Sequence, residues 1–238
     1  METALPASGP LTHAFAWIGG LLFVVSLVYT AFTYAMSFGQ PATATGVWGP
    51  VAIDVLLLSA FALHHSVFAR ERVRTRVARA VSSRLERSVY VWVASLMLIA
   101  VCALWQPVPG VAWDVTGPAA RMLHGLQIAG IVIALWSAAK IDALELAGIR
   151  QLEASPRPAE FMARGPYAWV RHPIYVGWFL MVFATSTMTA TRLVFAIVSS
   201  AYLIIAIPFE ERSLRTSTGG AYERYARLVR WKLVPGLY

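Results

Sequence analysis

The chain has 238 residues, of which 58% are hydrophobic and only 13% are charged. Soluble domains average about 45–50% apolar and about 25% charged residues, and so short a chain cannot bury this much apolar surface. This composition excludes intrinsic disorder, and the single cysteine, Cys102, excludes a disulfide scaffold and a cysteine-rich metal site. A formal charge of +8 points to nucleic acid or to a membrane, and the positive mean hydropathy favours the membrane.

Apolar runs long enough to cross a bilayer follow one another along the chain. A hydrocarbon core of about 30 Å takes roughly 20 helical residues. We expect spans at residues 13–38, 47–69, 88–105 and 119–146, and then two shorter runs, 174–189 and 193–209, that form a helical hairpin. The sequence therefore predicts an all-α, multi-pass membrane bundle of five or six transmembrane helices.

The basic residues are concentrated in alternate loops. Residues 70–87, 150–171 and 212–232 hold all of the 20 Lys and Arg side chains except Arg121, Lys140 and Arg192. The intervening loops carry one charged residue, Asp114. The positive-inside rule then predicts six crossings, with both termini in the cytoplasm of what we expect to be a bacterial inner membrane.

Two basic segments have the pattern of helices that lie on a membrane surface. Arginines alternate with Val and Ala after residue 70, which could serve nucleic acid but is more simply explained by anionic lipid headgroups. Near the C-terminus, one helix side carries Tyr222, Tyr225, Leu228 and Val229, and the other carries arginines. We therefore expect membrane lipids, and no nucleic acid, as partners of these segments.

Ionisable side chains collect at the cytoplasmic ends of two expected spans. His65 closes the second span, and Asp142 and Glu145 share one helix face at the end of the fourth. Ionisable groups within membrane segments usually face a bundle interior or a wet cavity. The alternative is that these groups are solvated among the headgroups, and for His65 and Glu145 both interpretations stay open. The region offers too few ligands for a metal site, so we expect none.

The segment from Gly165 to Gly177 is unlike ordinary membrane sequence. Pro173 suits the first turn of a helix, which places His172 at the positive end of that helix. Such a helix start, with Arg171 beside it, can bind a carboxylate or a phosphate. The alternative is an interfacial belt of aromatic and basic side chains.

A pair of glutamates, Glu210 and Glu211, is expected at the end of the last span. Carboxylates at a helix C-terminus oppose the macrodipole, which suggests a cationic partner, either a nearby arginine or a ligand amine. Together with the helix start at Pro173 and the surrounding aromatic rings, the pair predicts a site for a zwitterion.

The sequence YAWVRHPIYVGW, Tyr167 to Trp178, resembles the signature of the isoprenylcysteine carboxyl methyltransferases and related phospholipid methyltransferases. Glu210-Glu211 and the Tyr222/Tyr225 helix resemble the ending of that family. The resemblance implies a multi-pass enzyme that uses S-adenosylmethionine. It implies cofactor contacts from Gln151, Phe161, Met162, Tyr167, Arg171, His172, Pro173, Ile174, Tyr175, Glu210 and Glu211, with Ala159 and Glu160 beside Phe161.

The first half of the chain resembles a narrower group of proteins within this family. Residues 65–70, 86–88 and 141–151 are similar to the bacterial methanethiol S-methyltransferases. This implies a single membrane domain, residues 1–238, with four spans in 1–147 and the cofactor loop, hairpin and interfacial helix in 148–238. Carboxyl-methylating members place an arginine one turn before the paired glutamates, where this chain has Ala206.

These observations favour methyl transfer from S-adenosylmethionine to a small thiol such as methanethiol. Because the thiolate is the nucleophile, Glu145 and His65 are the candidate bases. One alternative is methylation of a prenylcysteine carboxylate or a lipid acceptor, which a lateral opening between spans would favour. The other is a membrane transport or structural protein without enzymatic activity. The sequence does not indicate the oligomeric state.

Overall fold

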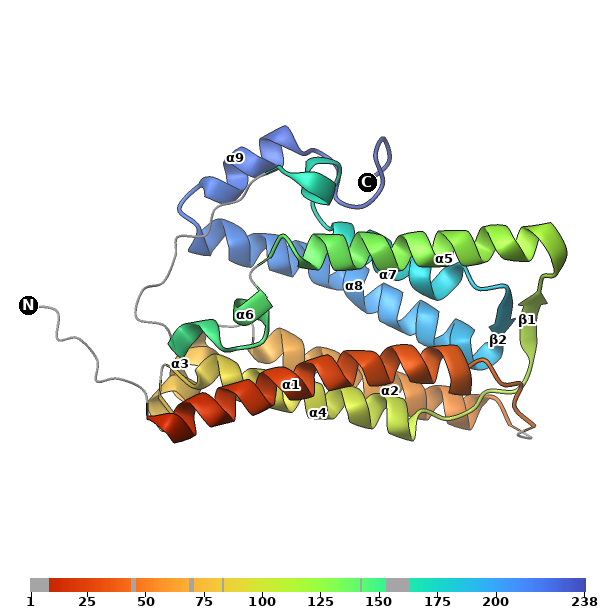
Figure 1. Cartoon of the computed structure of the whole chain (residues 1–238), viewed down its shortest axis with the longest axis horizontal. Helices are drawn as coiled ribbons and strands as arrows, with labels where there is room; N and C mark the ends of the chain where they lie inside the picture. The colour runs from red at the N-terminus through yellow and green to blue at the C-terminus, as the bar shows by residue number, and fades with distance from the viewer. Residues whose placement is uncertain (1–8, 44–45, 69–70, 83, 142, 153–162) are drawn as a thin grey trace, which may run out of the picture.

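The computed structural model describes residues 9–43, 46–68, 71–82, 84–141, 143–152 and 163–238. Most of these residues are helical, and the long helices run roughly along the longest axis of the molecule (Figure 1). A two-stranded sheet, formed by β1 (Val111–Asp114) and β2 (Thr187–Thr189), lies at one end of the bundle. The short helices α3 (Glu71–Ala80) and α6 (Ala143–Leu146) lie at the other end.

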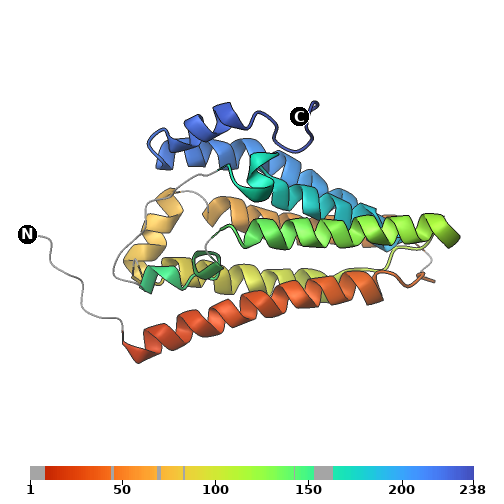
Figure 2. The same cartoon turned by 45° about the horizontal axis from the view of Figure 1, so that its top comes forward.

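Six helices form the bundle. They are α1 (Pro10–Phe32), α2 (Trp48–Phe68), α4 (Glu86–Leu104), α5 (Gly117–Ala138), α7 (Pro173–Phe183) and α8 (Ala190–Ser217). Their contacts follow the order α1, α4, α2, α8, α7, α5, so that α1 and α5 are the outermost members. Figure 2 shows α1 along the lower edge of the bundle, with α4 next to it.

Short elements connect these helices. A π-helical turn, η1 (Thr33–Ser37), continues α1, and α3 (Glu71–Ala80) joins α2 to α4. The small helix α6 (Ala143–Leu146) and the 3₁₀ turns η2 (Arg150–Leu152) and η3 (Gly165–Ala168) lie between α5 and α7. Helix α9 (Ala221–Leu228) follows α8.

Aromatic side chains fill the interior where five of the helices converge. Tyr34, Leu58, Val101, Val182 and Phe195 belong to one buried cluster, and they come from η1, α2, α4, α7 and α8 respectively. Phe195 lies at the centre of this cluster, with ring contacts to residues 34, 38, 105 and 178. The cluster joins the first and the second half of the chain.

Among the residues that the structure describes, five helices are long and apolar enough to cross a membrane, which confirms the predicted multi-pass bundle. They comprise 10–37, 48–68, 86–104, 117–138 and 190–217. The expected span 119–146 was wrong at its end, because α5 stops at Ala138 and Ala143–Leu146 forms a separate helix. The last span extends beyond the expected end at residue 209, because Pro208 lies inside α8 without ending it.

The first arm of the expected hairpin is shorter than predicted. Helix α7 has 11 residues, or about 16 Å of rise, which is too little to cross a bilayer alone. The segment from Gly165 to Ser186 nevertheless runs along the whole length of α5. Gly165 lies against Trp136 and Lys140 at one end of α5, and the carbonyl oxygen of Ser186 accepts a hydrogen bond from Val115 at the other.

Strands β1 (Val111–Asp114) and β2 (Thr187–Thr189) are antiparallel and occupy segments that were expected to be loops and helix. Arg192 connects several elements at this end of the bundle. Its guanidinium donates to the carbonyl oxygens of Tyr34, Ala35 and Thr187, so it joins η1 to β2.

Helix α3 is amphipathic, as the alternation of arginines predicted. Val73 and Val77 are half-buried, whereas Arg74, Arg76 and Arg79 are exposed. Arg74 forms an ion pair with Glu86 at the start of α4, with Nε 3.1 Å from Oε1. The helix therefore presents its basic side to the surroundings of the bundle.

Candidate active site

The segment between η3 and α7 is held in place by the end of the chain. The backbone N–H groups of Arg171 and His172 donate to the carbonyl oxygens of Trp231 and Lys232 at 2.9 and 3.0 Å. Helix α7 begins at Pro173, as predicted, and His172 is its N-cap residue. These bonds direct both side chains towards the glutamate pair of α8.

Glu211 is buried and neutralised within the protein. Its carboxylate lies 3.0 Å from Nε of Arg171 and 3.1 Å from Nη2 of Arg215. Nε2 of His172 lies 3.3 Å from the same carboxylate, whose side chain is only 3% exposed. The charge of Glu211 is therefore balanced by two arginines and is not available to a ligand.

Glu210 has a different environment. Its side chain is 45% exposed, and Oε2 accepts a hydrogen bond of 2.7 Å from the hydroxyl of Tyr175. Nδ1 of His172 lies 3.6 Å from the same oxygen, and the imidazole stacks on the Tyr175 ring with centroids 5.3 Å apart. The carboxylate of Glu210 is thus half-exposed and lies beside the rings of Tyr175 and His172.

The expectation that these glutamates end a helix was wrong. Helix α8 continues to Ser217, so both carboxylates lie within the helix and do not oppose its macrodipole at the terminus. The cationic partner that the expectation required is nevertheless present for Glu211, as Arg171 and Arg215. The start of α7, expected to bind an external anion, instead faces these two carboxylates of the same chain.

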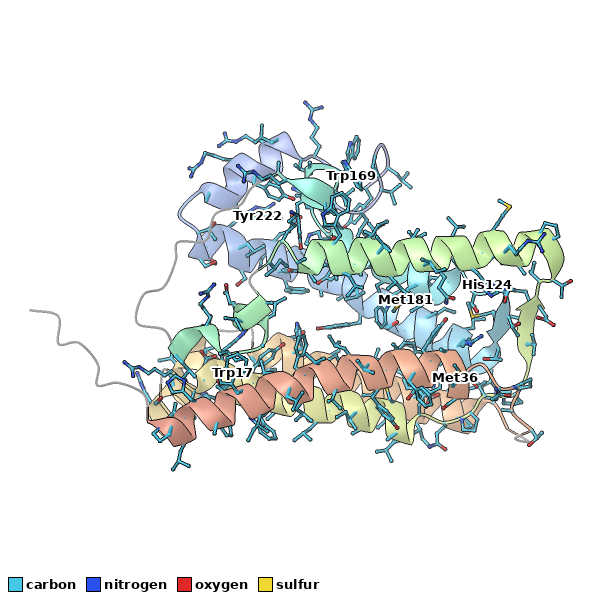
Figure 3. The ribbon with its side chains drawn as sticks, in the orientation of Figure 1. Trp17, Met36, His124, Trp169, Met181 and Tyr222 are labelled. Atoms are coloured by element: carbon cyan, nitrogen blue, oxygen red, sulfur yellow. The ribbon has the colours of Figure 1, made fainter. Side chains whose placement is uncertain are left out.

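Helix α9 covers this site, as its amphipathic pattern predicted. Tyr222, Tyr225 and Val229 are buried together against Tyr167 of η3. The hydroxyl of Tyr225 donates to the carbonyl oxygen of Tyr167 at 2.9 Å. Leu228, expected on the same side, is instead 78% exposed. Figure 3 shows Tyr222 and Trp169 on the same side of the bundle.

Burial changes the acidity of the tyrosines in this cover. It raises the pKa of Tyr225 to about 12, although the Arg171 guanidinium acts in the opposite direction. Burial also raises the pKa of Tyr167, and the nearby Tyr225 and Glu210 add to this effect. Both hydroxyl groups therefore stay protonated at neutral pH, and that of Tyr225 donates to the backbone of Tyr167.

Several predicted site residues lie together in this region. Pro173 is buried at the start of α7, and Ile174 is half-buried beside it. Phe161 and Met162, with their neighbours Ala159 and Glu160, lie outside the described residues, as does Asp142, and the side chain of Gln151 is not described. The structure brings together Tyr167, Arg171, His172, Pro173, Ile174, Tyr175, Glu210 and Glu211.

Glu145 lies on the side of the bundle that α1 and α4 form. It is exposed in α6, and the turn after α6 packs on α4, where the Ser88 hydroxyl donates to the carbonyl oxygen of Gly148 at 2.6 Å. A methyl group added at Gly20 of α1 would lie 3.3 Å from Ala147. The sequence predicted that Lys140 and Glu145 lie on one continuous helix, and this prediction was wrong.

His65 belongs to an aromatic cluster formed by α2, α4 and α8. Nδ1 of its ring is hydrogen-bonded to the hydroxyl of Tyr90, and the Tyr202 ring meets it edge-on with centroids 6.3 Å apart. Tyr202 lies on α8, the helix that carries Glu210 about two turns further along the chain. Helix α8 therefore carries both a ring beside His65 and the carboxylate of Glu210.

Three residues of this arrangement were not identified from the sequence. Arg215 had a usable signal, because it follows Glu211 by four residues on one helix. Tyr90 and Tyr202 had none, since nothing in the sequence separates them from other tyrosines in apolar segments. Across the described ranges, no group of three or more His, Cys, Asp and Glu side chains could hold a metal ion.

The arrangement of these groups is suited to a cationic ligand. Glu210 supplies a half-exposed carboxylate, Tyr175 and Tyr167 supply hydroxyls, and the ring of His172 supplies a polar aromatic face. A ligand with an ammonium group can be paired by the carboxylate and flanked by the rings.

Comparisons with known proteins relate the chain to methyltransferases. Residues 151–216 match the model of the isoprenylcysteine carboxyl methyltransferase (ICMT) family. The chain is 36% identical to methanethiol S-methyltransferase 2 of Bradyrhizobium diazoefficiens over 94% of this chain and 93% of that protein. It is 37% identical to the methanethiol S-methyltransferase of Mycobacterium tuberculosis over 89% and 92%, and 39% identical to that of Crocosphaera subtropica over 74% and 72%. No solved structure matches the chain.

Proposed function

The chain belongs to the isoprenylcysteine carboxyl methyltransferase family and is a multi-pass membrane methyltransferase, and we propose that it transfers the methyl group of S-adenosylmethionine to a small thiol such as methanethiol. The relatives named methanethiol S-methyltransferase, which match most of the chain, support this acceptor. The observation that carries the proposal is the half-exposed carboxylate of Glu210 beside Tyr175 and His172.

The residues present fit the methyl donor. S-adenosylmethionine carries an ammonium group, which the Glu210 carboxylate would hold, since Glu211 is already paired with Arg171 and Arg215. Tyr167, Pro173, Ile174 and Tyr175 would flank the rest of the donor, together with Gln151, Phe161 and Met162 from the preceding segment. Arg171 and His172 would contribute through their contacts with the two glutamates.

When bound, the donor supplies a methyl group that its sulfonium already activates. The tasks left to the protein are to orient the two reactants and to exclude water. Helix α9 serves the second task, because it covers η3 and buries Tyr222 and Tyr225 against it. The acceptor sulfur forms a bond to the methyl carbon, and the bond from that carbon to the donor sulfur breaks with its electron pair staying on the donor sulfur.

The thiol must lose its proton during this reaction, because the thiolate is the nucleophile. We propose His65 as the group that accepts this proton, because its ring meets that of Tyr202, which lies on the same helix as Glu210. In this role the Tyr90 hydroxyl, bonded to Nδ1, would orient the ring. Glu145 is the second candidate base, and its place in α6 beside α4 gives it less support.

A prenylcysteine carboxylate is a less suitable acceptor. Family members that methylate carboxylates have an arginine at the position of Ala206. Without that cation the acceptor carboxylate would be desolvated and poorly paired, which is costly in a membrane site.

The orientation proposed for the chain follows its charges. The basic helices α3 and α9 both lie toward the end of the bundle opposite the β1–β2 sheet (Figure 1). We place this end, the site and both termini in the cytoplasm of a bacterial inner membrane, with anionic lipids against the arginines of α3. We also treat residues 1–238 as one membrane domain.

The test is a headspace assay for dimethyl sulfide. Purified protein in detergent is incubated with S-adenosylmethionine and methanethiol, and the gas phase is analysed by chromatography. We expect dimethyl sulfide only when both substrates and the protein are present. Folded protein that binds S-adenosylhomocysteine but forms no dimethyl sulfide would show that the acceptor is a different compound.

A further inference from the structure

A groove of about 540 Å³ lies between α2 and α8. Leu58, which is 5% exposed, is the most buried side chain of its lining. Its rims are Leu63, Ile205 and Phe209, whose side chains are 62–67% exposed. Because both helices are long and apolar enough to span a membrane, a groove with a buried floor and exposed rims opens sideways into the hydrocarbon.

The polar end of this groove is close to the candidate active site. Tyr202 and Ser66 both line the groove, and the Tyr202 ring lies edge-on to that of His65 with centroids 6.3 Å apart. Ala206 and Phe209 of α8 also line it, and Phe209 directly precedes Glu210 in the chain. The groove therefore extends from the side of the bundle to the place where donor and acceptor are expected to meet.

The lining suits a neutral, apolar ligand. Among the residues that the structure describes, every side chain that lines the groove is uncharged, and Ala206 is one of them. Thiols and thioethers are neutral and apolar, so both the substrate and the product could pass along it. A carboxylate or an ammonium group in the same place would be left without a partner.

The volume of the groove exceeds what methanethiol needs. Pockets of about 300–1,000 Å³ typically hold ligands of drug size, whereas methanethiol has only two non-hydrogen atoms. We infer that the groove holds the alkyl chain of larger apolar thiols, which enter from the membrane and place their sulfur at the Tyr202 end, so that the enzyme methylates alkanethiols of several carbons as well as methanethiol. This inference rests on the proposed thiol methyltransferase activity.

The chemical step is the same for the longer acceptors. The alkanethiol sulfur gains the methyl group, the donor sulfur keeps the electron pair of the broken bond, and the thiol proton is released. The products are an alkyl methyl sulfide, S-adenosylhomocysteine and a proton. The added methylene groups move the acceptor from water into the membrane, from which it enters the groove, and this partitioning lowers the total concentration at which the acceptor binds.

The experiment compares methanethiol with 1-hexanethiol at saturating S-adenosylmethionine, with the methyl sulfides measured by gas chromatography. We expect the wild-type chain to methylate both, with a KM for 1-hexanethiol at least ten-fold lower. Ala62→Phe should lower the ratio of the two kcat/KM values, 1-hexanethiol over methanethiol, at least ten-fold, because Ala62 lines the groove. Ala60→Phe, two residues away at an exposed position outside the groove, should leave this ratio unchanged.

A second variant guards against a folding defect in the first. Ala201→Phe enters the same groove from α8 at an exposed position, and it should lower the ratio as well. Wild-type protein that methylates methanethiol but not 1-hexanethiol would overturn the inference. So would an unchanged ratio in both groove variants, which would indicate that the groove holds a lipid chain. Failure with every thiol, despite binding of S-adenosylhomocysteine, would instead overturn the proposed function.

Discussion

Glu210 and Glu211 are neighbours in the chain but have different tasks. Glu211 is buried between Arg171 and Arg215, whereas the carboxylate of Glu210 is half-exposed and bonded to Tyr175. A buried charge with two cationic partners stabilises the packing of the cover, and an exposed carboxylate beside aromatic rings is available to a ligand. We therefore assign a structural role to Glu211, and we propose that Glu210 binds the methyl donor.

This assignment predicts opposite effects of two isosteric substitutions. Glu211→Gln removes the charge that compensates Arg171, which is itself only 9% exposed, so we expect a loss of about 3 kcal/mol in the free energy of unfolding. Glu210→Gln should leave stability within about 0.5 kcal/mol of the wild type, because its partner Tyr175 can donate to an amide oxygen. Denaturant titration of both variants in detergent measures the difference, and equal stabilities would contradict the assignment.

The sequence predicts only part of this difference between Glu210 and Glu211. The spacing of Arg215 from Glu211 predicts an ion pair on one helix face. The contact of Arg171 with Glu211 could not be predicted, because it depends on how the end of the chain holds the segment before α7. For the same reason the hydrogen bond between His65 and Tyr90 could not be predicted, since these residues lie on different helices.

At the scale of elements, the contact between α5 and α7 positions the signature segment. Gly130 and Gly177 face each other at this contact, and a methyl group added at Gly177 would lie 2.6 Å from the carbonyl oxygen of Gly130. Only glycine permits the two backbones to approach so closely. The glycine of the signature therefore has a packing role in setting where His172 and Tyr175 lie.

Gly177→Ala should consequently destabilise the protein. The added methyl group collides with backbone atoms that cannot move without shifting a whole helix, so we expect a loss of about 1–3 kcal/mol. Gly125→Ala in α5 is the matched control, because a methyl group there has open space around it. Thermal unfolding monitored by circular dichroism compares them, and an unchanged midpoint for Gly177→Ala would refute the packing role.

The long helices were predictable because hydropathy alone specifies them. The four expected spans that begin before residue 120 match α1, α2, α4 and α5, apart from the end of the last. Helix α7 was predicted too long because its apolar run continues through Thr187–Thr189, which pair with β1 as a strand. Whether an apolar run forms a helix or a strand depends on its partner, and the partner lies about 75 residues away in the chain.

At the scale of the whole molecule, the bundle brings three features to one end. The donor site at Glu210, the cover formed by α9 and the polar end of the α2–α8 groove lie close together on α8 or against it. On the proposed function, the charged donor would reach this end from water and an apolar acceptor would reach it from the membrane. The two reactants, which have opposite solubilities, would then arrive by separate routes.

The central claim is that Glu210 binds the methyl donor, and isothermal titration with S-adenosylhomocysteine tests it most directly. This product shares the ammonium group of the donor and is stable during the measurement. We predict micromolar binding by the wild-type chain in detergent, weakened at least ten-fold by Glu210→Gln, whose fold should be intact. Wild-type affinity in Glu210→Gln, or no binding by well-folded wild-type protein, would contradict the account.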